Sequence, residues 1–293
     1  MSMSMSMPMS CTAAPTATAT TGTLPVPGAA LHYRLEGSGP LLVIAQSGEG
    51  DADRTVDLVP HLAGDFTVLT YDRRGLSRSR LDEPGRTTSL AEHAEDLHRL
   101  LASLTDEPAL MLGCSFGAVI GLHLAVRHPG RVATLVAHEP VAPRLLPAAD
   151  RVRHEAELTE LQEIHRSGGL GAVFPEMARV VGIDLSRPDT EPGLTPQPLD
   201  DRRRANFAYF VEHDFSAVIQ DTALDPRALA ATTTRIVPAV GAATPSTVFD
   251  RRCATALADL LGTEIRSFPG GHNGNTTHPR AYAAVLRALF TAP

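Results

Sequence analysis

The stretch ALMLGCSFG, residues 109–117, decides the fold. It begins with a short apolar run typical of a buried strand and leads into residues 116–127, a mainly apolar segment that predicts a helix. Between them, Gly113 and Gly117 flank Ser115. A serine at such a strand-to-helix turn needs small neighbours, and its Oγ lies at a helix N-terminus, where developing negative charge is favoured. The pattern therefore predicts that Ser115 is a nucleophile.

Outward from this turn, apolar runs alternate with helical patterns, which indicates a mostly parallel α/β sheet flanked by helices. Helices are predicted at 90–104 and 116–127, one before and one after the strand at 109–112. Two more amphipathic helices are predicted near the end of the sequence, at 254–261 and 281–290. The predicted strands cover residues 31–35, 41–45, 66–71, 109–112, 132–137, 235–240 and 264–268.

Residues 141–225 interrupt this alternation. They contain a charged helical pattern from Asp150 to about His165, a loop rich in proline and glycine at 187–198, and an aromatic helical pattern at 204–215. An all-helical insertion between two parallel strands predicts a cap or lid over the carboxyl edge of the sheet, where open α/β sheets bind ligands.

The N-terminal segment differs in composition from the rest. Met alternates with Ser, and once with Pro, over the first nine residues, and small residues with Thr and Pro follow. Residues 1–28 are therefore predicted to be a disordered low-complexity tail. The remaining chain is assigned as a core of residues 29–140 and 226–293, with residues 141–225 as the helical cap.

Three stretches together identify a family. YDRRGLSRS at 71–79, the glycine-flanked Ser115 and GGHNG at 270–274 occur in an order and spacing that resemble the α/β-hydrolase superfamily, in its serine-nucleophile branch with a helical cap. The resemblance covers about residues 30–293 and implies the α/β-hydrolase fold. A serine rather than an aspartate at position 115 argues against the epoxide-hydrolase and dehalogenase branches, which need a carboxylate nucleophile.

The resemblance also implies a base and an acid. His272 follows the last strand on a glycine-flanked loop, where the family places the base that activates the serine. The family's acid would fall near Ala243, but residues 241–249 contain no carboxylate. Glu139, at the end of the strand after Ser115, is the preferred replacement, Asp250 is the second candidate, and a site without a functional acid is the third possibility. The helix histidines are interpreted as surface or edge residues: His93, His98, His123, His128, His154 and His165.

The oxyanion hole needs two backbone N–H donors. The residue after the nucleophile, Phe116, supplies one, and the loop after residues 41–45 supplies the other, with Ser47 at the expected position. The side-chain amide of Gln46 is a weaker candidate for a third donor.

Composition narrows the remaining possibilities. The net charge of −7 makes nucleic acid an unsuitable partner, and no apolar run is long enough to span a membrane. Three widely spaced cysteines favour a reducing compartment, and without a signal segment the cytoplasm is the expected location. No metal-binding or cofactor-binding motif is present, so neither a metal nor a cofactor is expected.

These observations predict a serine hydrolase that cleaves an ester, lactone or thioester through an acyl-enzyme. Aromatic residues and a methionine in the cap suggest a hydrophobic acyl or polyketide-like small molecule as substrate, which would suit bacterial secondary metabolism: Phe174, Met177, Phe207, Tyr209, Phe210 and Phe215. Packing of the cap on the sheet explains the same residues equally well. The alternative function, motivated by the missing acid, is a hydrolase-like scaffold acting as a lyase, cyclase or ligand-binding protein. A homodimer is compatible with the sequence.

Overall fold

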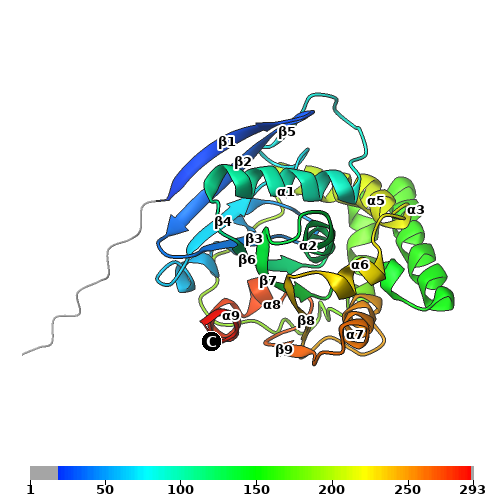
Figure 1. Cartoon of the computed structure of the whole chain (residues 1–293). Coiled ribbons are helices and arrows are strands. Elements are labelled where there is room, and N and C mark those ends of the chain that lie inside the picture. The colour runs from blue at the N-terminus through cyan, green and yellow to red at the C-terminus, as the bar shows by residue number, and fades with distance from the viewer. Residues whose placement is uncertain (1–18, 292–293) are drawn as a thin grey trace, which may run out of the picture.

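A computed structural model describes residues 19–291 of the chain (Figure 1). Within these residues, nine strands form one sheet in the order β1-β2-β4-β3-β6-β7-β8-β9, and β5 pairs with β2. Strand β2 is antiparallel to its neighbours, whereas every pair from β4 to β9 is parallel. The strands are β1 (Thr20–Val26), β2 (Ala29–Gly37), β3 (Leu41–Ala45), β4 (Thr67–Tyr71), β5 (Arg80–Leu81), β6 (Ala109–Cys114), β7 (Val132–His138), β8 (Arg235–Gly241) and β9 (Arg266–Phe268).

Helices cover the sheet and fill the insertion at residues 141–225. Short helical turns lie at η1 (Ala52–Thr55), η2 (Val59–His61), η3 (Pro143–Leu145) and the π-helical turn η4 (Phe210–Asp214). The α-helices are α1 (Leu90–Leu104), α2 (Phe116–Arg127), α3 (Ala148–Val180), α4 (Asp201–Tyr209), α5 (Phe215–Ile219), α6 (Pro226–Ala231), α7 (Phe249–Leu261), α8 (Gly274–Thr277) and α9 (Pro279–Thr291). The predicted fold class, a mostly parallel sheet flanked by helices, is confirmed.

The prediction of a disordered tail is wrong for its last part. Thr20–Val26 is a strand in which all seven residues pair with β2 in antiparallel register. Threonine and valine favour extended backbone, and Gly28, with φ of 75°, allows the tight turn back into β2. Thr, Gly and Pro are common in tails, so the composition of this segment alone favours low complexity. Residues 1–18 lie outside the described part of the chain.

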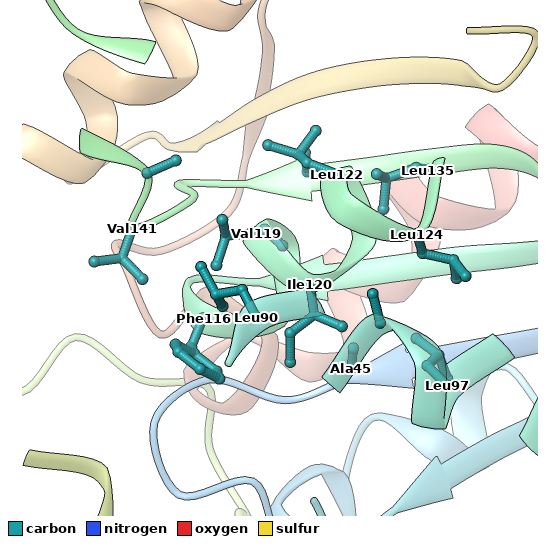
Figure 2. Packing of buried hydrophobic residues seen from close by; sticks show 14 of the residues in the cluster. Ala45, Leu90, Leu97, Phe116, Val119, Ile120, Leu122, Leu124, Leu135 and Val141 are labelled. Atoms are coloured by element: carbon teal, nitrogen blue, oxygen red, sulfur yellow. The ribbon is translucent and has the colours of Figure 1, made fainter. Parts of the chain in front are cut away.

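Side chains alternate between the two faces of the central strands and create two hydrophobic layers. Val43 and Leu135 face the layer under α1 and α2, which Figure 2 shows with Leu97 and Ile120 packed between helix and sheet. The alternate positions on these strands face a second layer, formed with α9 and with residues in and around η2. Because each strand is buried on both faces, its sequence is a continuous apolar run rather than an alternating one.

The insertion begins directly after β7 and returns to the sheet at β8. Its long helix α3 is interrupted at Gly169, whose φ of 68° and ψ of −167° are not helical. The charged pattern predicted to end near His165 therefore continues across this kink to Val180. In Figure 1, α3 and α5 lie together at one side of the molecule.

Candidate active site

Ser115 lies in the sharp turn between β6 and α2. Its φ of 51° and ψ of −112° are strained for a residue with a side chain. The turn is possible because a Cβ on Gly117 would lie 2.1 Å from the carbonyl oxygen of Ala45, and one on Gly113 would lie 2.6 Å from the Cα of Ala118. Both glycines therefore let α2 pack against the sheet while Ser115 lies at the N-terminus of α2.

His272 and Glu139 are in direct contact, although 133 positions separate them in the chain. His272 Nδ1 is 2.7 Å from Glu139 Oε2, and the Glu139 side chain is fully buried. Its other oxygen accepts a hydrogen bond of 2.9 Å from the backbone N–H of Gly241. Glu139 has a φ of 44°, a left-handed conformation that places its side chain between β8 and the His272 loop.

The two groups alter each other's pKa. Burial alone would raise the pKa of Glu139, but the His272 hydrogen bond and charge, together with the Gly241 N–H, lower it to about 2. For His272, burial lowers the pKa, yet the hydrogen bond and charge of Glu139 and the charge of Asp250 outweigh it and raise the pKa. Glu139 is therefore ionised at neutral pH and stabilises the imidazolium form of His272.

Asp250 occupies a different position from the one expected of a triad acid. It lies in the first turn of α7, with Val248 as the N-cap residue. Its Oδ2 is 3.8 Å from His272 Nε2, the ring nitrogen opposite the one that Glu139 contacts. Of the two candidate acids, Glu139 thus contacts Nδ1 of His272, and Asp250 lies beside Nε2.

One cavity of about 380 Å³ is lined by Ser115, His272, Ser47 and Asp250, whereas Glu139 and Phe116 are not among its lining residues. Five of the six cap residues chosen from the sequence also line it: Phe174, Met177, Phe207, Phe210 and Phe215. Tyr209 is not among the lining residues, and its hydroxyl donates to the carbonyl of Arg86. The cavity therefore combines a reactive polar end with walls that are mostly apolar.

The loop that carries Ser47 is held by Arg73, a residue for which the sequence predicts no function. The buried Arg73 guanidinium donates hydrogen bonds to three successive carbonyls, those of Gln46 at 3.2 Å, Ser47 at 2.5 Å and Gly48 at 2.9 Å. Because a trans peptide directs its C=O and N–H to opposite sides, the bond to the Gln46 carbonyl points the Ser47 N–H away from Arg73. Arg73 thereby fixes the direction of the predicted oxyanion donor.

Arg73 is itself held from two sides. Asp214, in η4 of the insertion, accepts a hydrogen bond from its Nη2 at 2.6 Å, and both side chains are about 1% exposed. The guanidinium carbon lies 4.5 Å from the ring centroid of Phe116, the residue predicted to supply the second oxyanion donor. The sequence signal was present in YDRRGLSRS, but only the structure shows that Arg73 reaches the loop. Gln46 donates its side-chain amide to Thr55 at 2.8 Å instead of offering it to the oxyanion hole.

The interpretation of the helix histidines as surface residues is wrong for three of them. His93, His123 and His154 are 3% or less exposed. Each lies near a carboxylate that compensates for its burial: Asp214 for His93, Asp221 for His123 and Asp250 for His154. Helical spacing alone could not reveal these partners, because all three carboxylates come from segments distant in sequence.

Two further properties concern only residues 19–291. No three His, Cys, Asp or Glu side chains in this range are grouped so that they could hold a metal ion. No helix in the same range is long and apolar enough to cross a bilayer.

Comparison with known proteins identifies the family. A family model described as the alpha/beta hydrolase fold matches residues 40–163. The chain is 38% identical to the uncharacterized hydrolase YraK of Bacillus subtilis over 92% of this chain and 95% of that protein. It is 27% identical to the zearalenone hydrolase of Cladophialophora bantiana over 87% and 90% of the two chains. The chain therefore belongs to the α/β-hydrolase family and is a hydrolase of that family.

Solved structures agree with this assignment. The crystal structure of a hydrolase from Pseudomonas aeruginosa PA01 superposes with a TM-score of 0.66 and 26% sequence identity. The match covers 93% of this chain and 98% of that one. The shared architecture extends over the insertion as well as the sheet, because so little of either chain is left uncovered.

Arg73 and Asp214 give a test of how the oxyanion loop is held. Arg73→Met leaves the buried Asp214 carboxylate with only His93 nearby, at 3.7 Å, and we expect a loss of about 3–5 kcal/mol in the free energy of unfolding. The double variant Arg73→Met/Asp214→Asn should recover most of this stability, yet kcat should stay at least about tenfold below wild type because the Ser47 N–H is no longer fixed. Urea unfolding and ester kinetics measure the two effects. A stable double variant with wild-type kcat would contradict the assignment.

Proposed function

We propose that the protein is a serine hydrolase that cleaves a hydrophobic ester, lactone or thioester through an acyl-enzyme. The observation that supports this most strongly is the buried 2.7 Å contact between Glu139 and His272, beside a cavity that Ser115 also lines. The relatives named as hydrolases support the reaction class. The same contact counts against the alternative of a scaffold without a functional triad, because Glu139 offers the acid that the loop after β8 lacks.

In this mechanism, His272 Nε2 takes the proton of Ser115 as Oγ attacks the acyl carbon. The backbone N–H groups of Phe116 and Ser47 stabilise the oxyanion of the tetrahedral intermediate. His272 then returns the proton to the leaving group, and water releases the acid in a second, similar step. Glu139 keeps the imidazole in one orientation and stabilises its positive charge throughout.

Covalent labelling tests the nucleophile. A fluorophosphonate probe should add its mass to the wild-type protein, because it reacts with an activated serine hydroxyl. Ser115→Ala should abolish both labelling and cleavage of a short activated ester, as measured by intact mass and product absorbance. Labelling that persists in Ser115→Ala would assign another nucleophile, and a wild-type protein that neither labels nor cleaves any activated ester would refute the proposal.

Paired variants test the acid. Glu139→Gln removes the charge that orients His272 Nδ1, so we expect the acylation rate to fall by up to about 10⁴-fold. Asp250→Asn leaves that nitrogen untouched and should change acylation far less. Stopped-flow release of the leaving group during the first turnover measures this step for both variants. The reverse order of effects would make Asp250 the triad acid.

The pH dependence follows from the raised pKa of His272. The base must be neutral to accept a proton, so kcat/KM should rise with pH along a limb whose midpoint lies above the ordinary value of 6.5. The charge of Asp250 contributes to this shift, so Asp250→Asn should move the limb to lower pH. Initial rates under subsaturating ester between about pH 5 and 9 measure both profiles. A wild-type limb at or below 6.5 would contradict the expected electrostatics.

A further inference from the structure

Asp250 and His154 form a second buried pair in the cavity, beside the proposed Ser–His machinery. His154, on α3 of the insertion, places its Nε2 3.2 Å from Asp250 Oδ1. Both residues line the cavity, and they are only 1% and 5% exposed. Asp250 Oδ2, the other carboxylate oxygen, is the one that lies 3.8 Å from His272 Nε2.

His154 is surrounded by two carboxylates and an aromatic ring. Burial would lower the pKa of His154, but Asp250 and Glu157 outweigh it and raise the pKa to about 9. The His154 ring also stacks on Phe249, with ring centroids 5.0 Å apart and an interplanar angle of 22°. At neutral pH, His154 is therefore protonated, and its positive charge lies beside the Asp250 carboxylate.

The 3.8 Å separation has a geometric consequence. An oxygen atom that forms a hydrogen bond of about 2.8 Å with His272 Nε2 can also lie within about 3 Å of Asp250 Oδ2. In the proposed mechanism, three oxygens occupy that position in turn: the Ser115 Oγ, the leaving-group oxygen and the oxygen of the attacking water. A hydroxyl has a single hydrogen, which is shared with Nε2. Only water carries a second hydrogen that a nearby acceptor can bind.

We propose that Asp250 positions the hydrolytic water in the deacylation step, an inference that rests on the proposed acyl-enzyme mechanism. The water donates one hydrogen to His272 Nε2 and the other to Asp250 Oδ2, which leaves an oxygen lone pair free to attack the acyl carbon.

Deacylation conserves atoms and charge. As the new C–O bond forms, the water O–H bond to Nε2 breaks, and His272 takes that proton. The tetrahedral intermediate then expels the Ser115 Oγ, which regains the proton from Nε2. The product is the free carboxylic acid, and the hydrogen held by Asp250 stays on the new carboxyl group until that group ionises in solvent.

The role of Asp250 predicts a preference between nucleophiles. An alcohol that attacks the acyl-enzyme has only one hydroxyl hydrogen, which must go to His272 Nε2. It therefore gains nothing from Asp250, whereas water loses a charged acceptor when Asp250 is replaced. Both nucleophiles need the same base and the same oxyanion donors, so their ratio isolates the contribution of Asp250.

The experiment measures this ratio directly. A p-nitrophenyl ester of an apolar acid is turned over in buffer with a fixed low concentration of methanol, and the free acid and methyl ester are quantified by chromatography. In Asp250→Asn, protonated His154 favours the amide oxygen, which turns the NH₂ group toward the water. We expect the acid-to-methyl-ester ratio to fall about tenfold or more, as for loss of a hydrogen bond to a charged group.

Two further variants complete the design. Glu157→Gln, which changes the other carboxylate near His154 at 3.6 Å, should keep the wild-type ratio. Asp250→Ala also lacks the acceptor and is measured in parallel, so that either soluble Asp250 variant decides the question. A wild-type ratio in the Asp250 variants, or an equal shift in Glu157→Gln, would overturn the inference while leaving the proposed function intact. A wild-type protein that forms no acyl-enzyme would instead refute the proposed function.

Discussion

The site depends on one buried contact, the hydrogen bond between Glu139 and His272. An ionised carboxylate without exposure to water is costly unless its oxygens are bound. Glu139 meets this condition through His272 on one oxygen and the backbone N–H of Gly241 on the other. The acid, the last strands of the sheet and the histidine loop are therefore fixed relative to one another, and the strained backbone of Glu139 is the cost of that arrangement.

The insertion does more than cover the cavity, because it supplies countercharges to the core. Asp214 compensates Arg73 beneath the loop that carries Ser47, and His154 compensates Asp250 beside His272. Each core group is buried and would be destabilising alone. The insertion and the core are therefore coupled by these two ion pairs. If the insertion moved away, Arg73 and Asp250 would each lose a partner of opposite charge.

Local patterns predicted most of the fold and part of the candidate site. The apolar runs and helical spacing predicted α1, α2 and β3 with their observed bounds. Short motifs indicated Ser115 and His272 as candidate site residues. The features that the sequence did not predict depend on contacts between residues that are far apart in the chain. β1 is ordered by pairing with β2 rather than by its own composition, and Arg73 acquires its function only where it meets Gln46 and Asp214. His154 is a helix residue whose burial depends on Asp250, 96 positions later.

The loop after β8, which contains no acid, is closely packed against the histidine segment. The loop bonds to the histidine segment through its backbone: Ala242 N–H donates to Phe268 O at 2.8 Å, and Ala243 N–H to Gly270 O at 2.9 Å. A Cβ on Gly241 would lie 2.5 Å from the carbonyl carbon of Gly271, so this approach leaves no room for a side chain there. The same close packing presents the Gly241 N–H to Glu139. The backbone N–H of Gly241 at the end of β8 thus binds one oxygen of Glu139, and the other oxygen contacts His272. The carboxylate reaches His272 from the end of β7, the strand next to β8.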